Sequence, residues 1–280
     1  ILITADPDGD RVGLAVRQGE DYVLLTGNQT GAILIEYLLT QLKEKGQMPA
    51  NGRVFKTIVT SDLGRVIAEY HGSSTEDVLT GFKFIGEKIK QYTESKEYTF
   101  LFGYEESYGY LIQPFVRDKD AIQSVLAITE AAAFYKMQGK TLLDVLHDLF
   151  ERHGYYFEGL VSITKKGADG ARAIQSLLTN LRNQPLVEVA GIAISSQEDY
   201  LKQTRSFTDG RKDENLTLPK SDVLKYFLAD GSWVCVRPSG TEPKIKYYIG
   251  VTSPTKVESK EKLNSIKTQF TDEMEQRFSM

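Results

Sequence analysis

The chain has 280 residues, of which 41% are hydrophobic, 26% are charged and 10% are aromatic, and its formal net charge at pH 7 is −4. This composition excludes a disordered or fibrous chain and is typical of a globular protein with about two domains. The acidic balance argues against nucleic acid as a partner, because contacts to a phosphate backbone need a basic surface. No apolar run reaches the roughly 18–20 residues of a membrane helix. The single cysteine cannot form an intrachain disulfide, so we expect a reducing compartment, the cytoplasm.

Strand-like and helix-like segments alternate through the first half of the chain, which indicates an α/β architecture. The apolar patterns predict strands at 1–4, 14–16, 22–25, 53–60, 78–80 and 98–102. They predict helices that begin near Asn28 or Thr30, after Asp62, and at 82–91, 121–138 and 142–153, the last with a capping box at its start.

The pattern changes after Gly154 and predicts a second, α+β domain, with a boundary near 153–158. The expected order is a strand at 156–164, a helix at 170–183, strands at 187–194, 200–207, 223–228, 232–236 and 244–251, and a charged helix at 255–278. The predicted fold class is therefore a mixed-sheet α/β sandwich followed by a smaller α+β domain.

The first polar loop spans residues 6–11, reads Asp-Pro-Asp-Gly-Asp-Arg and follows a predicted strand. Three carboxylates at alternate positions around Pro and Gly can converge on one hard cation. A calcium EF-hand is excluded, because its sixth position needs glycine and its twelfth glutamate, where this chain has Arg11 and Arg17. Since Arg11 adds an anion-binding guanidinium, the loop favours a metal that bridges to a phosphate.

The second polar loop spans residues 103–109 and reads Gly-Tyr-Glu-Glu-Ser-Tyr-Gly. It lies at the carboxyl end of a predicted strand, where ligands of α/β sheets usually bind. Two carboxylates and a hydroxyl suit the recognition of several hydroxyl groups at once, as a sugar presents them. Considered alone, the spacing fits an ordinary polar turn equally well.

The third polar loop spans residues 237–244 and reads Arg-Pro-Ser-Gly-Thr-Glu-Pro-Lys, between two predicted strands. Hydroxyls, backbone N–H groups at a glycine turn and a guanidinium together form a phosphate cradle. A Pro/Gly hairpin with incidental hydroxyls is the alternative for this loop alone. A metal loop, a polyol loop and a phosphate loop in one chain favour a phosphosugar.

Few other residues suggest chemistry. Lys119 precedes a predicted helix, and a lysine near a carboxylate loop can transfer protons. His147 and His153 are not spaced four apart as a helical metal pair would be, and we expect His71 to be exposed. Cys235 is expected in the core.

Together the three loops resemble those of the α-D-phosphohexomutase family, in the bacterial-type branch of phosphoglucomutases, phosphomannomutases and phosphopentomutases. The resemblance implies that Arg11 lies near a phosphoserine and that Lys119 is the general acid/base, although Ala121 replaces the glycine of the family's Lys-Asp-Gly segment. It also implies a magnesium site formed by Asp6, Asp8 and Asp10. The residues of the implied substrate site are Thr80, Gly81, Glu105, Ser107, Arg237, Ser239, Gly240 and Thr241.

The resemblance further implies a four-domain enzyme, of which this chain holds a remnant of the second domain (1–25), the third α/β domain (26–153) and the C-terminal α+β domain (154–280). The family's nucleophilic serine lies in a Ser-His-Asn-Pro-like motif of the first domain, and no histidine of this chain lies in such a motif. We therefore expect a C-terminal fragment that is inactive alone and whose partner is the missing N-terminal part of the same protein.

By this resemblance, the full enzyme interconverts glucose 1-phosphate and glucose 6-phosphate through a phosphoserine and glucose 1,6-bisphosphate. The Glu-Glu-Ser triplet resembles glucose-selective members of the family, whereas activity on mannose or pentose phosphates remains an alternative. A non-catalytic module that binds calcium or a sugar phosphate is the alternative from a different class.

Overall fold

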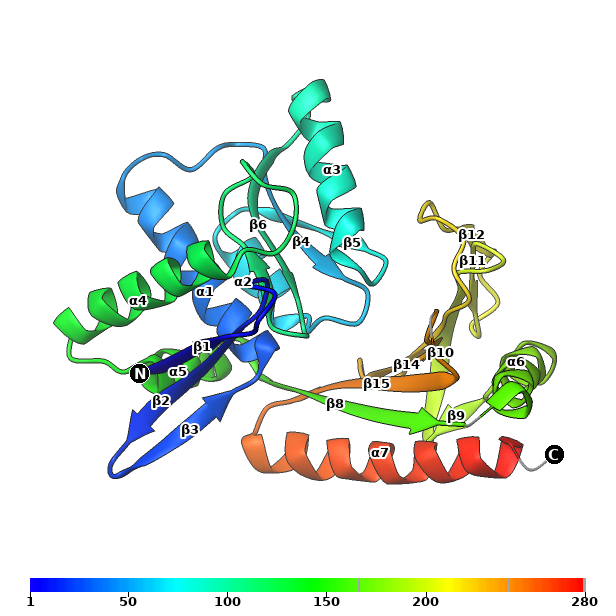
Figure 1. Cartoon of the computed structure of the whole chain (residues 1–280). Coiled ribbons are helices and arrows are strands. Elements are labelled where there is room, and N and C mark those ends of the chain that lie inside the picture. The colour runs from blue at the N-terminus through cyan, green and yellow to red at the C-terminus, as the bar shows by residue number, and fades with distance from the viewer. Residues whose placement is uncertain (166, 241, 279–280) are drawn as a thin grey trace. The chain divides into compact units, whose positions relative to one another are not determined.

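A computed structural model describes residues 1–165, 167–240 and 242–278 (Figure 1). The chain divides between Gly154 and Tyr155 into two compact units, the first unit and the second unit. Among the helices of the described ranges, none is both long and apolar enough to cross a membrane.

The first unit begins with a small antiparallel sheet in the order β1 (Leu2–Ala5), β2 (Val12–Gln18) and β3 (Asp21–Leu25). Ala5 pairs with Val12, so residues 6–11 form the turn of a hairpin. Val12, Leu14 and Val16 are buried at alternate positions of β2, as expected for a strand with one face against a core.

The main sheet of the first unit is mixed and has the strand order β5-β4-β6-β7. β4 (Gly52–Thr57) pairs in parallel with β5 (Ser74–Val78) and with β6 (Thr99–Glu105), and β7 (Gly109–Leu111) is antiparallel to β6. Because β4, β5 and β6 run in one direction, their carboxyl ends meet at one edge of the sheet. This edge is where α/β proteins bind ligands.

Helices lie on both faces of this sheet. The adjacent residues Phe55 and Lys56 of β4 point to opposite faces, Phe55 into a cluster with Ile85 and Ile89 of α3, and Lys56 to Asp62 before α2. The helices of the unit are α1 (Gly27–Glu44), α2 (Leu63–Tyr70), α3 (Phe82–Ser95), α4 (Ala121–Met137) and α5 (Leu142–His153).

The start of α1 differs from the prediction. Thr26 is the N-cap: its hydroxyl accepts from the Gln29 N–H at 3.2 Å, and the Gln29 side chain accepts from the Thr26 N–H at 3.0 Å. This capping box satisfies two backbone donors of the first turn, so the predicted caps Asn28 and Thr30 were wrong and are buried inside the helix.

Two further expectations for the first unit were wrong. Of the strand expected at 78–80, only Val78 lies in a strand, as the last residue of β5. The other residues of β5, Ser74–Asp77, are polar and do not form an apolar run. His71 is only 7% exposed, because its Nε2 lies 2.9 Å from Glu36 Oε2 in α1. The residues around His71 in the sequence predict that it is exposed, because its polar partner Glu36 lies far away in the sequence.

The second unit is built on an antiparallel sheet in the order β12-β11-β10-β13-β14-β15-β8, with β9 paired to β10. Its helix α7 runs along β15 and β8 (Figure 1). The elements are β8 (Tyr155–Thr164), α6 (Gly167–Asn183), β9 (Glu188–Val189), β10 (Ile192–Asp199), β11 (Thr204–Phe207), β12 (Glu214–Asn215), β13 (Leu224–Leu228), β14 (Trp233–Pro238), β15 (Lys244–Ser253) and α7 (Lys256–Phe278).

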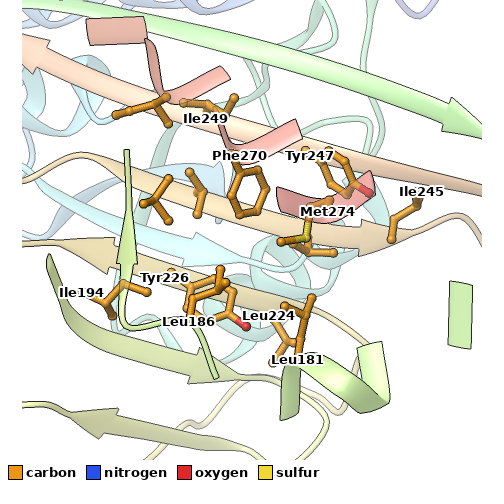
Figure 2. Packing of buried hydrophobic residues seen from close by; sticks show 14 of the residues in the cluster. Leu181, Leu186, Ile194, Leu224, Tyr226, Ile245, Tyr247, Ile249, Phe270 and Met274 are labelled. Carbon is orange, nitrogen blue, oxygen red and sulfur yellow. The ribbon is translucent and has the colours of Figure 1, made fainter. Parts of the chain in front are cut away.

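The core of the second unit lies between this sheet and its two helices (Figure 2). Phe270 and Met274 of α7 pack with Tyr247 of β15, and the Tyr247 and Phe270 rings meet edge to face at 5.5 Å. Cys235 is fully buried, as predicted. The chain is therefore a mixed-sheet α/β sandwich followed by an antiparallel α+β unit, which confirms the predicted fold class.

Candidate functional site

The turn between β1 and β2 brings three carboxylates together. Asp6, Asp8 and Asp10 each place one oxygen within 4.8 Å of the other two. Asp10 Oδ1 is buried and accepts no hydrogen bond from the described residues. The Arg11 Nε lies 3.8 Å from this oxygen. Converging carboxylate oxygens, one of them buried without a hydrogen bond in the described part of the chain, fit a hard divalent cation.

Asp6 is held in the ionised form that a metal ligand needs. Its Oδ1 accepts from the backbone N–H groups of Asp10 and Arg11, at 3.1 and 3.2 Å. Burial acts to raise the pKa of Asp6, but these hydrogen bonds and the Arg11 charge outweigh it, so the pKa is lowered.

Lys119 lies against this turn. Its Nζ is 3.2 Å from Asp10 Oδ2 and 3.1 Å from Asp118 Oδ1. Burial acts to lower the pKa of Lys119, but the two carboxylates outweigh it and the pKa is raised.

Gly109 makes room for the Lys119 side chain, since a Cβ there would come within 2.1 Å of Lys119 Cδ. The Ala121 N–H also donates to Gly9 O at 3.0 Å, so the residue that departs from the family's glycine contacts the turn through its backbone.

Glu105 lies at the carboxyl end of β6 and is 6% exposed. Its Oε1 accepts from the Gly81 N–H at 3.0 Å, which joins two of the predicted substrate residues. Burial raises the pKa of Glu105 and the Glu106 charge adds to this, against the opposing effects of Gly81, Lys119 and Arg11. The last two cations therefore lie within electrostatic reach of Glu105.

The loop after Glu105 is held in an unusual backbone conformation. Tyr108 has φ +70°, a left-handed value that costs a non-glycine residue about 1–3 kcal/mol. Its carbonyl accepts from the Val12 N–H at 3.0 Å. On the other side, a Cβ on Gly27 would come within 2.2 Å of Glu106 O, so the first turn of α1 packs directly on the loop backbone. β2 and α1 together fix the loop.

The first unit thus holds the three-aspartate turn with Arg11 and Lys119, and Glu105 with Gly81. Ser107 and Thr80 are half-buried neighbours of Glu105 and Gly81 in the chain. The three-dimensional structure joins segments that are far apart in the sequence.

The predicted phosphate loop belongs to the second unit and connects β14 to β15. Its ends are paired, with the Ser239 N–H donating to Lys244 O at 2.7 Å, and Ser239 Oγ accepts from the Glu242 N–H at 3.4 Å. Arg237 is half-buried and Gly240 is exposed. Thr241 lies outside the described residues.

A cavity of about 450 Å³ opens beside this loop. Ser239 and Gly240 line it together with Gly167 and Ala171 from the start of α6. Lys246, which was not among the predicted site residues, lies opposite Arg237 in the β14–β15 register and so shares its face of the sheet. The alternation of Lys244 and Lys246 after the loop was the signal that could have identified it.

Comparisons with known proteins match both units. Residues 26–153 match the model of "Phosphoglucomutase/phosphomannomutase, alpha/beta/alpha domain III", and residues 177–266 match that of the C-terminal domain of the same family. The chain is 40% identical over 255 residues to a phosphoglucomutase of Staphylococcus epidermidis, covering 90% of this chain and 45% of that protein. It is 36% identical over 267 residues to a phosphoglucomutase of Staphylococcus aureus, covering 95% and 47%. The chain therefore spans about half the length of these relatives.

Solved structures show the same fold. The parafusin phosphoglucomutase of Paramecium in its open form gives a TM-score of 0.67 at 18% identity, over 99% of this chain and 44% of that one. A phosphomannomutase-like protein of Thermus thermophilus gives 0.62 at 17% identity, over 98% and 45%. With both family models matched and relatives above one-third identity, the chain belongs to the phosphoglucomutase/phosphomannomutase family.

Proposed function

We propose that this chain supplies the sugar-recognition and phosphate-binding parts of a phosphoglucomutase, an isomerase that interconverts glucose 1-phosphate and glucose 6-phosphate by phosphoryl transfer from and to an enzyme serine. The observation that carries the proposal is the cluster in the first unit, where Lys119 pairs with Asp10 of the three-aspartate turn and packs against Gly109 at the end of the loop that begins with Glu105. The relatives named phosphoglucomutase support the choice of reaction.

In this proposal, residues 1–25 end a second domain, 26–153 form the third and 154–280 the C-terminal domain. Asp6, Asp8 and Asp10 would hold a magnesium ion, which when bound offsets negative charge on a phosphoryl group. The Arg11 side chain is 56% exposed and its Nε lies 3.8 Å from Asp10 Oδ1, so its guanidinium lies beside the metal loop and would contact that phosphoryl group as a bidentate donor.

Glu105 and Ser107 would bind ring hydroxyls, with Thr80 and Gly81 at the neighbouring turn. Lys119 would exchange a proton with the sugar hydroxyl that gains or loses the phosphoryl group. Its pairing with two carboxylates keeps it charged and therefore able to donate.

The loop of the second unit would hold the phosphate that is not transferred. Arg237, Ser239, Gly240 and Thr241 offer a guanidinium, hydroxyls and backbone N–H groups. Such a site recognises charge and not sugar stereochemistry, so it suits either end of the substrate.

The experiment compares this chain with a longer protein that contains it together with a Ser-His-Asn-Pro segment. We expect the longer protein to convert glucose 1-phosphate in a coupled assay that reads glucose 6-phosphate, and to lose at least about a hundredfold in rate on Lys119→Met, in the range of a general acid/base. This chain alone should give no turnover. A longer protein that prefers mannose 1-phosphate, or a turnover unaffected by Lys119→Met, would contradict the proposal.

A further inference from the structure

Glu106, the middle residue of the Glu-Glu-Ser triplet, binds a different turn from its neighbour Glu105. Its Oε2 lies 3.3 Å from Thr57 Oγ1 and 3.2 Å from Thr60 Oγ1, and both hydroxyls are positioned to donate. The two hydroxyl oxygens are 2.8 Å apart, so the two hydroxyl protons are shared among the three contacts that join Thr57, Thr60 and Glu106. Glu105 accepts instead from the Gly81 N–H. The two adjacent carboxylates therefore connect the loop after β6 to the turns after β4 and β5.

The turn after β4 is a rigid attachment point. Thr57 and Thr60 are fully buried, and the Thr60 N–H donates to Thr57 O at 3.1 Å. Lys56, also fully buried, donates to Thr60 O at 3.0 Å and forms ion pairs with Asp62 and Asp77 at 3.0 and 3.2 Å. A buried charge with this many partners adopts one arrangement, so the hydroxyls that receive Glu106 are fixed in place.

We propose that Glu106 is a positioning residue, which holds Glu105 and Ser107 in the geometry that a sugar ring requires without contacting the sugar itself. The inference rests on the proposed function and assigns a role that neither the loop motif nor the comparisons give to this residue. Glu106 adds a third attachment to the contacts of β2 and α1, and a strained residue such as Tyr108 at φ +70° persists only where its surroundings over-determine it. A displacement of about 1 Å at a binding residue can cost on the order of a hundredfold in rate.

The first arm of the test needs no ligand. Amide hydrogen exchange at residues 105–108 is measured in the whole chain and in Glu106→Ala, Glu106→Gln and Glu87→Ala, the last a control at an exposed glutamate of α3. Glu106→Ala should speed exchange in the loop about tenfold or more, because it removes a hydrogen-bonded charged acceptor. Glu106→Gln keeps an acceptor oxygen and should stay within about threefold of the parent. Glu87→Ala should change nothing there.

The second arm measures binding of glucose 1-phosphate and of inorganic phosphate by NMR titration. Glu106→Ala should weaken glucose 1-phosphate binding about tenfold or more and leave inorganic phosphate binding unchanged, because only the sugar contacts depend on the loop. Because the phosphate loop lies in the second unit, loss of the fold of the first unit is checked separately, by an unchanged urea unfolding transition of that unit in Glu106→Ala. Glu106→Gln should restore the sugar-phosphate affinity.

Thr60→Val provides the same test from the other side of the contact, should Glu106→Ala fail to fold. It removes one donor at nearly constant volume and should reproduce the faster loop exchange. Unchanged exchange in both Glu106→Ala and Thr60→Val, or a Glu106→Gln variant as impaired as Glu106→Ala, would overturn the proposal. A parent chain that binds no glucose 1-phosphate would count against the proposed function, whereas the exchange arm still decides whether Glu106 holds the loop.

Discussion

Replacement of Lys56 by methionine tests whether the buried ion-pair network stabilises the first unit. Lys56 is 0% exposed, and burial alone acts to lower its pKa. The Asp77 and Asp62 carboxylates outweigh burial, so the pKa of Lys56 is raised and the side chain is charged at neutral pH. Methionine nearly preserves the volume, so the substitution removes the charge and leaves little cavity.

The structure sets the expected magnitude. Removal of one partner of a buried ion pair costs roughly 3–5 kcal/mol, because the other charge remains buried. Here Asp62 and Asp77 remain 33% and 30% exposed, and Arg65 still pairs with them at 3.4 and 2.7 Å. We therefore expect the low end of that range, about 3 kcal/mol of lost unfolding free energy.

The assay is urea unfolding at pH 7, followed by far-UV circular dichroism and by fluorescence. Trp233 is the only tryptophan and lies in the second unit, so its fluorescence transition separates that unit from the first. Lys56→Met should move the first unit's transition and affect the Trp233 transition less. The control is Lys140→Met, which breaks the exposed pair with Asp148 and should cost less than about 1 kcal/mol. A loss of unfolding free energy below about 1 kcal/mol for Lys56→Met itself would show that the buried ion pairs of Lys56 do not stabilise the first unit as expected.

Three further outcomes are expected. Burial acts to raise the pKa of Glu36, but hydrogen bonds from His71 and Arg152 outweigh it and the pKa is lowered. The stabilisation by the Glu36 carboxylate is therefore present above the unfolded pKa of 4.5 and is lost as pH falls through the folded pKa. The difference in unfolding free energy between the parent and Glu36→Gln, measured by urea unfolding, should shrink below about pH 4.5, and a constant difference would contradict this. Gly109→Ala forces Lys119 to move and should cost about 1–3 kcal/mol in thermal unfolding. Asp8→Asn should weaken magnesium binding, read by calorimetry on the whole chain, while an unchanged affinity would remove Asp8 from the ligand set.

Much of the fold could be predicted because local signals agree with the final structure. The capping box of Thr141 and Asp144 begins α5 as expected, and the apolar runs mark β6 and β15. The strand at β5 was predicted at the wrong residues because β5 is mostly polar, and its polar residues are stabilised by partners far along the chain. Glu76 pairs with Arg53, and Asp77 pairs with Lys56. Hydrophobic periodicity carries no information about such pairs.

The candidate site shows the same division. The sequence motifs predict the three loops as candidate sites, since each has residue types that suit one kind of ligand, and these roles stay predictions. The contacts between loops were not predictable, because Glu105 meets Gly81 and Glu106 meets Thr57 only once the parallel strands align their carboxyl ends. Likewise Asp62 predicted a helix cap, yet it makes no capping hydrogen bond and its carboxylate pairs with Lys56 instead.

We propose above that the loop after β14 binds the phosphate of a glucose phosphate. The most direct measurement is a calorimetric titration of the chain with glucose 1-phosphate, repeated with mannose 1-phosphate and on Arg237→Ala. We expect saturable binding by the parent chain, tighter binding of glucose 1-phosphate than of mannose 1-phosphate, and loss of binding in Arg237→Ala. Equal binding by the parent and Arg237→Ala, or no saturable binding by the parent at millimolar ligand, would contradict it.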